Sequence, residues 1–157
     1  MLKTIKRYIL LFGAAILLLA SSLSGAAQDK GYWRAASTNS AAITGDISIS
    51  ETKVTIDFTG FTIAQIHKLT PAEAAAIFDL EGDNNGSGNL YRMNIPAAKR
   101  FLHRNTLCGS DDTQWMATYA SGRTLQIAFF SGPDLPIMTP DALAKSTNLC
   151  GTFAYVH

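Results

Sequence analysis

The chain has 157 residues, of which 47% are hydrophobic and 16% charged, and its formal net charge is +1. Three of its 13 basic residues and none of its 12 acidic residues lie in the first 27 positions, so the rest of the chain is slightly acidic. This balance disfavours nucleic acid as a partner, because binding to phosphates needs a net basic face.

The N-terminal segment has the three parts of a secretory signal peptide. Basic residues precede an apolar run at positions 8–20, and a stretch of small residues follows and ends at Ala27. The alternative is an uncleaved membrane anchor, but the run is shorter than the roughly 20 residues that span a bilayer. We therefore expect cleavage after Ala27 and a single periplasmic or secreted domain at residues 28–157, without a transmembrane segment.

The first part of this domain has the period-two hydrophobicity of β-strands. Apolar residues alternate with polar ones over residues 43–49, and again at Val54, Ile56 and Phe58. Two such runs separated by a short polar segment predict a hairpin. Residues 61–69 predict a third strand.

Helix signals follow the third strand. Thr70 and Glu73 flank Pro71 in the pattern of a capping box, which predicts a short helix. A Gly/Asn loop at residues 82–88 ends it. Residues 90–95 predict a strand, and residues 96–104 a second short helix.

Strong strand patterns occupy the last third of the chain. Residues 114–120 and 124–131 predict two strands, the second of which is apolar on both faces and therefore central. After a loop at residues 132–136, Thr139 and Pro140 predict another short helix. The expected fold is mostly β: a small antiparallel β-barrel or sandwich of seven to eight strands with two or three short helices.

The chain contains two cysteines, Cys108 and Cys150, each within a Leu-Cys-Gly triplet. Export favours a disulfide between them. Closing a loop of about 40 residues would stabilise the fold by about 4 kcal/mol in the chain-entropy model. The alternative, a reactive Cys108 thiolate with a histidine base, needs a reducing compartment or an unpaired cysteine.

No catalytic or metal-binding pattern of similar strength is present. A loop beginning at Glu81 resembles the start of a calcium loop, but its twelfth position is Arg92 instead of a bidentate carboxylate. The adjacent residues Asp111 and Asp112 could in principle act as a catalytic acid and base, but the polar segment around them is typical of a turn. We therefore expect no enzyme activity, cofactor or metal. A hydrolase whose active site has no recognisable sequence pattern ranks third, after the two binding and structural hypotheses given below.

Two kinds of binding site are open. Trp33, Tyr91 and Trp115 would line an apolar ligand pocket if the barrel were not filled. A protein partner would instead meet protruding loops. The two candidate loops contain Asp111 and Asp112, and Pro133 and Asp134.

Short motifs resemble known groups of proteins. The opening Gly31-Tyr32-Trp33 resembles the Gly-x-Trp start of lipocalin-type barrels, which implies a barrel. The segments Asn105-Thr-Leu-Cys-Gly and Leu149-Cys-Gly-Thr resemble a group of small exported bacterial proteins without an assigned activity. That second resemblance implies export and a disulfide.

The leading functional hypothesis is an exported, non-enzymatic binding protein of the periplasm or cell envelope. Its target would be a protein partner, for example a secreted hydrolase that it inhibits, or a small apolar ligand. The alternative is a structural envelope component that is held in an assembly through an exposed strand edge.

Overall fold

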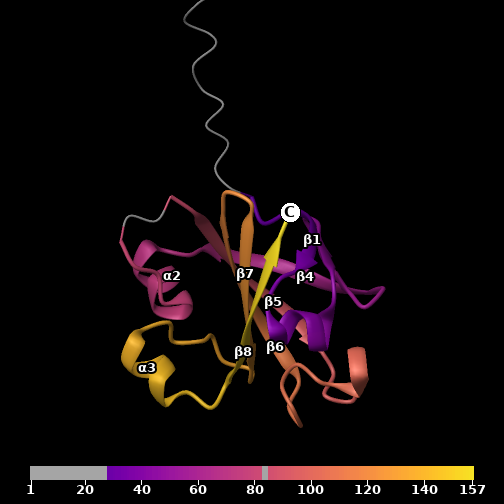
Figure 1. Cartoon of the computed structure of the whole chain (residues 1–157). Coiled ribbons are helices and arrows are strands. Elements are labelled where there is room, and N and C mark those ends of the chain that lie inside the picture. Colours follow the sequence, from indigo (N-terminus) through magenta and orange to yellow (C-terminus); the bar gives the residue numbers. More distant parts are fainter. Residues whose placement is uncertain (1–27, 83–84) are drawn as a thin grey trace, which may run out of the picture.

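The computed structural model describes residues 28–82 and 85–157, which form a closed barrel of eight antiparallel strands in chain order (Figure 1). The predicted signal peptide, and Asp83 and Asn84 of the calcium-like loop, lie outside the described residues. The strands are β1 (Gly31–Ala35), β2 (Ile47–Ile49), β3 (Lys53–Ile56), β4 (Thr59–Lys68), β5 (Ser87–Ile95), β6 (Thr113–Ser121), β7 (Thr124–Ser131) and β8 (Leu149–Val156). The short helices are η1 (Ser40–Thr44), α2 (Pro71–Phe78), η2 (Leu102–Arg104) and α3 (Pro140–Lys145).

The up-and-down order of the strands places successive connections at opposite ends of the barrel. The connections β1–β2, β3–β4, β5–β6 and β7–β8 share one end, which we call the disulfide end because Cys108 lies in the β5–β6 connection. The other end, the termini end, contains the β6–β7 turn and the C-terminus (Figure 1). Loops far apart in sequence are therefore neighbours at the same end.

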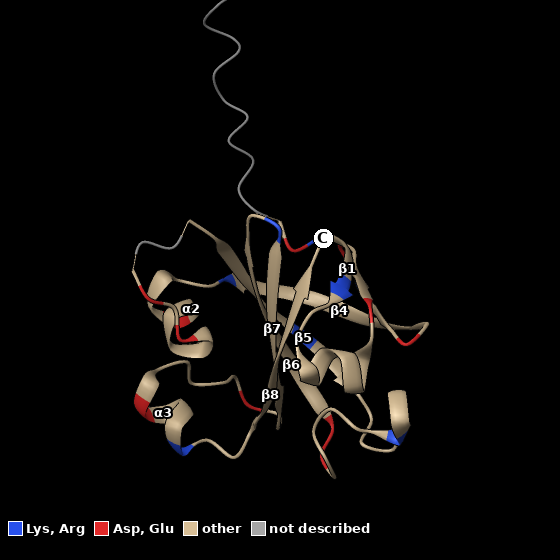
Figure 2. Cartoon of the chain, viewed as in Figure 1, with Lys and Arg blue, Asp and Glu red and all other residues tan. Residues whose placement is uncertain are grey.

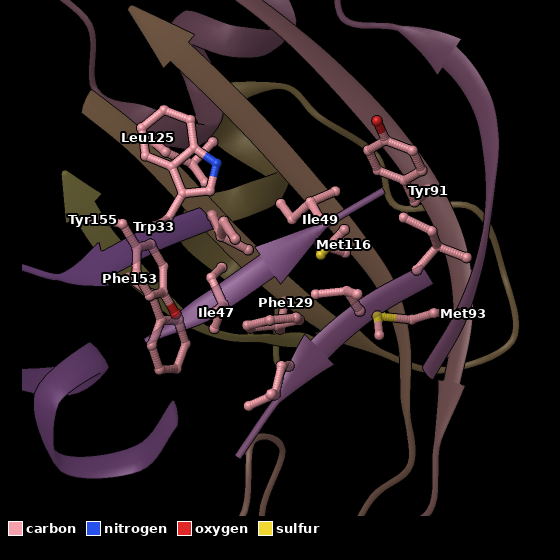
Figure 3. Close-up of a cluster of buried hydrophobic side chains, with 14 of the residues drawn as sticks. Trp33, Ile47, Ile49, Tyr91, Met93, Met116, Leu125, Phe129, Phe153 and Tyr155 are labelled. Atoms are coloured by element: carbon pink, nitrogen blue, oxygen red, sulfur yellow. The ribbon is translucent and has the colours of Figure 1, made fainter. Parts of the chain in front are cut away.

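The barrel interior is filled with side chains. Trp33, Tyr91, Phe129 and Tyr155 each have an exposed fraction of 1% or less, and Figure 3 shows them among aliphatic side chains and Met116. Inward positions alternate along the strands, as the period-two pattern predicts. This interior cluster is the main hydrophobic core.

A second hydrophobic cluster lies outside the barrel. Ile77 and Phe78 of α2 pack with Trp115 and Phe130, which point outward from β6 and β7. Figure 1 shows α2 and α3 together on this side. Strand β7 is thus buried on both faces, which confirms its predicted central position.

The predicted strand over residues 43–49 is wrong in its first half. Residues up to Thr44 belong to η1, and β2 begins only at Ile47. The Ser40 hydroxyl accepts hydrogen bonds from the backbone N–H groups of Ala36 and Ser37, and donates to the carbonyl of Ala154 at 2.8 Å. These bonds stabilise a helical turn there in place of a strand.

The prediction that Phe58 continues the β3 pattern is also wrong. Strand β3 ends at Ile56, which pairs with Thr59, so Asp57 and Phe58 form a two-residue turn. Both have positive φ, 46° and 60°, and the Phe58 side chain is 100% exposed.

The predicted capping box of α2 is confirmed. The Thr70 hydroxyl accepts from the Glu73 N–H at 3.2 Å, and the Glu73 carboxylate accepts from the Thr70 N–H at 2.8 Å. The predicted helix at residues 96–104 is reduced to the single turn η2, because Phe101 before it is extended and His103 and Arg104 at its end have positive φ. Within residues 28–82 and 85–157, no helix combines the length and hydrophobicity needed to cross a membrane.

Candidate partner-binding site

The predicted disulfide is present and joins the β5–β6 connection to β8. Cys108 and Cys150 have Cα atoms 4.9 Å apart and are separated by 42 positions in sequence. Gly109 has φ of 64°, in the region that favours glycine, so the chain turns sharply beside the bridge. The bridge fixes this connection to the barrel wall.

Residues 110–112 follow the bridge, immediately before β6, and form what we call the acidic turn. Asp111 and Asp112 are exposed, and Figure 2 shows acidic positions on this loop at the bottom of the view. One Asp112 carboxylate oxygen accepts from the Ala97 N–H at 2.8 Å, and the Asp111 N–H donates to the Cys108 carbonyl at 3.1 Å. The turn is therefore held by these two hydrogen bonds, while Asp111 and Asp112 stay exposed to solvent.

Residues 132–139 form a second exposed segment, which we call the proline loop. It contains Pro133 and Pro136 and has no regular secondary structure. Leu135 and Ile137 are 52% and 70% exposed, whereas Met138 is buried in the outer cluster. Because proline restricts the backbone, the loop presents its apolar side chains with reduced conformational freedom.

The structure brings the acidic turn and the proline loop together at the disulfide end. A cavity of about 470 Å³ is lined by the acidic turn, and one of about 350 Å³ by the proline loop and α3. Both are also lined by Ser131 and Asn148, so they adjoin. All four loop residues predicted from sequence, Asp111, Asp112, Pro133 and Asp134, thus lie in two neighbouring segments.

Trp115 connects the two segments. Its indole N–H donates to the Gly132 carbonyl at the start of the proline loop, at 3.0 Å. The Arg92 guanidinium lies over the indole ring at 4.5 Å and donates to the carbonyl of Gln114, at the start of β6 beside the acidic turn. The sequence predicted neither the contact of Arg92 with Trp115 nor the bond of Trp115 to Gly132, since both depend on how the chain folds around β5 and β6.

The three aromatic residues predicted to line a ligand pocket do not face one space. Trp33 and Tyr91 point into the barrel and are both 0% exposed. Figure 3 shows them within the packed interior. Trp115 belongs to the outer cluster, on the other side of the barrel wall.

A buried carboxylate that sequence reasoning missed closes the termini end. Asp29 is 3% exposed, and one of its oxygens accepts from Tyr91 at 2.8 Å, Asn89 at 3.0 Å and Thr118 at 2.5 Å. The Lys30 ammonium lies 3.6 Å from the other oxygen. An aspartate beside a predicted cleavage site carries no sequence signal for such a network.

Two opposing effects act on the pKa of Asp29. Burial on its own raises the pKa, but the hydrogen bonds from Thr118, Asn89 and Tyr91, with the charge of Lys30, lower it below its usual value. Burial and the nearby Asp29 charge raise the pKa of Tyr91, which stays a neutral donor. The network suits a structural role, because its donors and acceptor satisfy one another.

Histidines and acidic residues show no metal-like arrangement in the parts of the chain that the structure describes. No group of three or more His, Cys, Asp or Glu side chains there could hold a metal ion. His67 lies 3.4 Å from Glu73, and His157 stacks on Trp33 with ring centroids 3.7 Å apart. Both histidines therefore have structural neighbours.

No family model, curated protein or solved structure matches this chain. Its function must therefore be inferred from its own surfaces. The disulfide end combines two features of protein-binding sites: apolar side chains on a restrained loop, and adjacent exposed charge.

Proposed function

We propose that this protein is an exported, non-enzymatic binding protein that engages a protein partner in the periplasm or outside the cell. The observation that carries the proposal is the proline loop, which exposes Leu135 and Ile137 while Met138 anchors it. A restrained loop loses less conformational entropy on binding than a free one. Its exposed apolar side chains gain by burial in a partner.

The acidic turn supplies the polar part of the same surface. Asp111 and Asp112 lie beside the proline loop and would form a charged rim around an apolar centre. The disulfide and Trp115 support both segments from the barrel side. Exposed apolar side chains on a proline-restricted loop would suit burial in a partner's cleft, so inhibition of a secreted hydrolase is the specific activity to test.

A small apolar ligand in the barrel was the other occupant predicted from sequence. The buried interior favours the protein partner instead, because Trp33, Tyr91 and their neighbours already occupy that space. Aromatic side chains that are fully packed leave no surface for a ligand to cover.

Site-specific photo-crosslinking in the exporting cell tests this proposal. A benzophenone amino acid placed at position 135 should form a defined adduct with one protein. The same group at position 66 serves as control, because Ile66 is similarly exposed, at 48%, but lies on β4. Equal adducts from both positions would argue against a site at the proline loop.

The affinity for the captured partner then tests the roles of Leu135 and Ile137. With the captured protein purified, the double substitution Leu135→Ser and Ile137→Ser should weaken binding at least about tenfold, since two apolar side chains lose their burial. Ile66→Ser should leave the affinity within about twofold. Unchanged affinity of the double variant would refute the proposed site.

A further inference from the structure

A separate groove of about 310 Å³ lies on the outer face of β1, β2 and β3. The aromatic rings of Tyr32 and Phe58 border it, and the small side chains of Ser48 and Thr55 line it. Figure 1 shows α2 and α3 on the opposite side of the barrel, so these helices do not cover it. It shares no lining residue with the cavities at the acidic turn and the proline loop.

Two carboxylates, Asp46 and Asp57, give the groove negative charge. Asp46 accepts from the Tyr32 hydroxyl at 2.5 Å and from the Ala35 N–H at 2.9 Å, and these donors, with a smaller contribution from Arg34, lower its pKa. The donors in contact with Asp46 are neutral, so the negative charge remains.

No cation within the described part of the chain forms an ion pair with either carboxylate. The ion pairs found there involve Asp29 and Glu73. Arg34 is close enough to influence the pKa of Asp46, but its guanidinium donates to the backbone oxygen of His157 at 3.5 Å. The charge in the groove is therefore available to a ligand.

Phe58 occupies its position against two physical preferences. Its ring is 100% exposed, and its φ of 60° lies in the left-handed region that disfavours side chains with a Cβ. Two-residue hairpin turns of this conformation favour Asn-Gly or Asp-Gly. Strained and exposed residues of this kind concentrate at functional sites.

We propose that this groove binds an arginine side chain presented by an extended segment of a protein partner. The planar guanidinium can stack on the rings of Phe58 and Tyr32 while its N–H groups donate to the carboxylates of Asp46 or Asp57. Arginine fits better than lysine because its planar fork both stacks and pairs with a carboxylate. The groove includes residues of the β1–β2 and β3–β4 connections and shares none with the acidic turn or the proline loop, so this site does not depend on the function proposed for those two segments.

A short peptide titration tests the chemistry. The probe is acetyl-Gly-Arg-Gly-amide, and the matched control contains citrulline in place of arginine, which keeps the shape and removes the charge. Two-dimensional amide NMR should show saturable shifts at Asp46, Asp57 and Phe58 with the arginine peptide. Binding of the citrulline peptide should be at least about tenfold weaker.

Variants separate binding from folding. Asp57→Asn and Phe58→Gly should each weaken binding of the arginine peptide at least about fivefold. Phe58→Gly is the sharper variant, because glycine accepts the observed φ. Weaker binding by a variant that keeps its folded amide spectrum then comes from the missing ring. Asp141→Asn removes an exposed charge in α3 and should leave the affinity unchanged.

Three results would overturn the proposal. Both peptides could bind equally, or both groove variants could bind like the unmodified protein. The same amides could also shift with an N-acetylglucosamine trisaccharide and not with the arginine peptide, which would make the groove a carbohydrate site.

Discussion

The indole N–H of Trp115 donates to the backbone carbonyl of Gly132 at 3.0 Å, so one side chain of β6 holds the first residue of the proline loop. The same indole lies against the Arg92 guanidinium. The hydrogen bond and the stacking contact are separable, because phenylalanine keeps a ring but has no N–H donor.

Trp115→Phe should therefore loosen the proline loop without unfolding the barrel. We expect the free energy of unfolding to fall by about 1–2 kcal/mol, from the lost hydrogen bond and the smaller ring. Hydrogen exchange at the Ser131 amide, which donates to the Asn148 carbonyl, should become faster. Urea denaturation and amide exchange by NMR measure the two effects.

Tyr119→Phe is the matched control. It removes an aromatic hydroxyl that accepts from the Gly86 N–H at 3.1 Å, at a different loop. It should reduce stability by about 1 kcal/mol and leave exchange at Ser131 unchanged. Faster exchange at Ser131 in both variants would show that Trp115 has no specific effect on the loop.

The Asp29 network should make stability depend on pH. Because folding lowers the pKa of Asp29, its stabilisation is complete above the unfolded value of about 4 and is lost as the pH falls through the lower folded value. Asp29→Asn should reduce the free energy of unfolding at pH 7 by about 2 kcal/mol and flatten its decrease below about pH 4. Urea denaturation across pH 2–7 provides the measurement.

The control for charge alone is Asp141→Asn, which removes an exposed carboxylate from the first turn of α3. Its pH profile should follow that of the unmodified protein. If the free energy of unfolding of Asp29→Asn fell as steeply with decreasing pH as that of Asp141→Asn, the buried carboxylate would contribute no pH-dependent stability.

Loss of the disulfide should be costly and non-additive. Cys150→Ser opens a loop of 42 positions and should lower the free energy of unfolding by about 2–5 kcal/mol. Cys108→Ser should have the same effect, and the double variant should cost little more than either single one, because the crosslink is already absent. A double variant with twice the loss would indicate that cysteine packing, and not the bridge, provides the stability.

Phe58→Gly should stabilise the protein. Glycine adopts the positive φ of this position without the strain that a Cβ causes. We expect this relief to outweigh the greater conformational entropy that glycine gives the unfolded chain, so the free energy of unfolding should rise by about 0.5–1 kcal/mol. Gly122→Ala gives the opposite test. Gly122 has φ of 57° and open space where a Cβ would lie, so backbone strain alone should cost this variant about 1 kcal/mol. A destabilised Phe58→Gly variant would show that the ring supports the fold.

Much of the fold follows from local sequence patterns. The alternation in β5 and the apolar faces of β7 predicted these strands, and the Thr70 to Glu73 pattern predicted the α2 capping box. The period of two is a property of each strand's own backbone, and the capping box joins residues three positions apart, so both leave a local pattern in the sequence. The Cys108 to Cys150 pairing also followed, because the chain contains no other cysteine.

Other segments were decided by contacts that sequence patterns do not contain. The Ser40 hydroxyl bonds to Ala154, 114 positions away, and this long-range bond helps to hold residues 40–44 in a helical turn. The pairing of Ile56 with Thr59 forced Phe58 into a turn that lacks the usual glycine. Asp29 was not recognised because its partners are 60 to 89 positions away.

The candidate site was also predicted only in part from the sequence. Composition identified residues 111–114 and 132–136 as protruding loops, since aspartate, glycine and proline disfavour regular structure, although β6 already begins at Thr113. Only the closed antiparallel barrel placed them together, because it returns the β5–β6 and β7–β8 connections to the same end. The sequence could not decide whether Trp33 and Tyr91 would border a cavity or fill the barrel. The answer depends on packing, and therefore on the volumes of side chains from every strand.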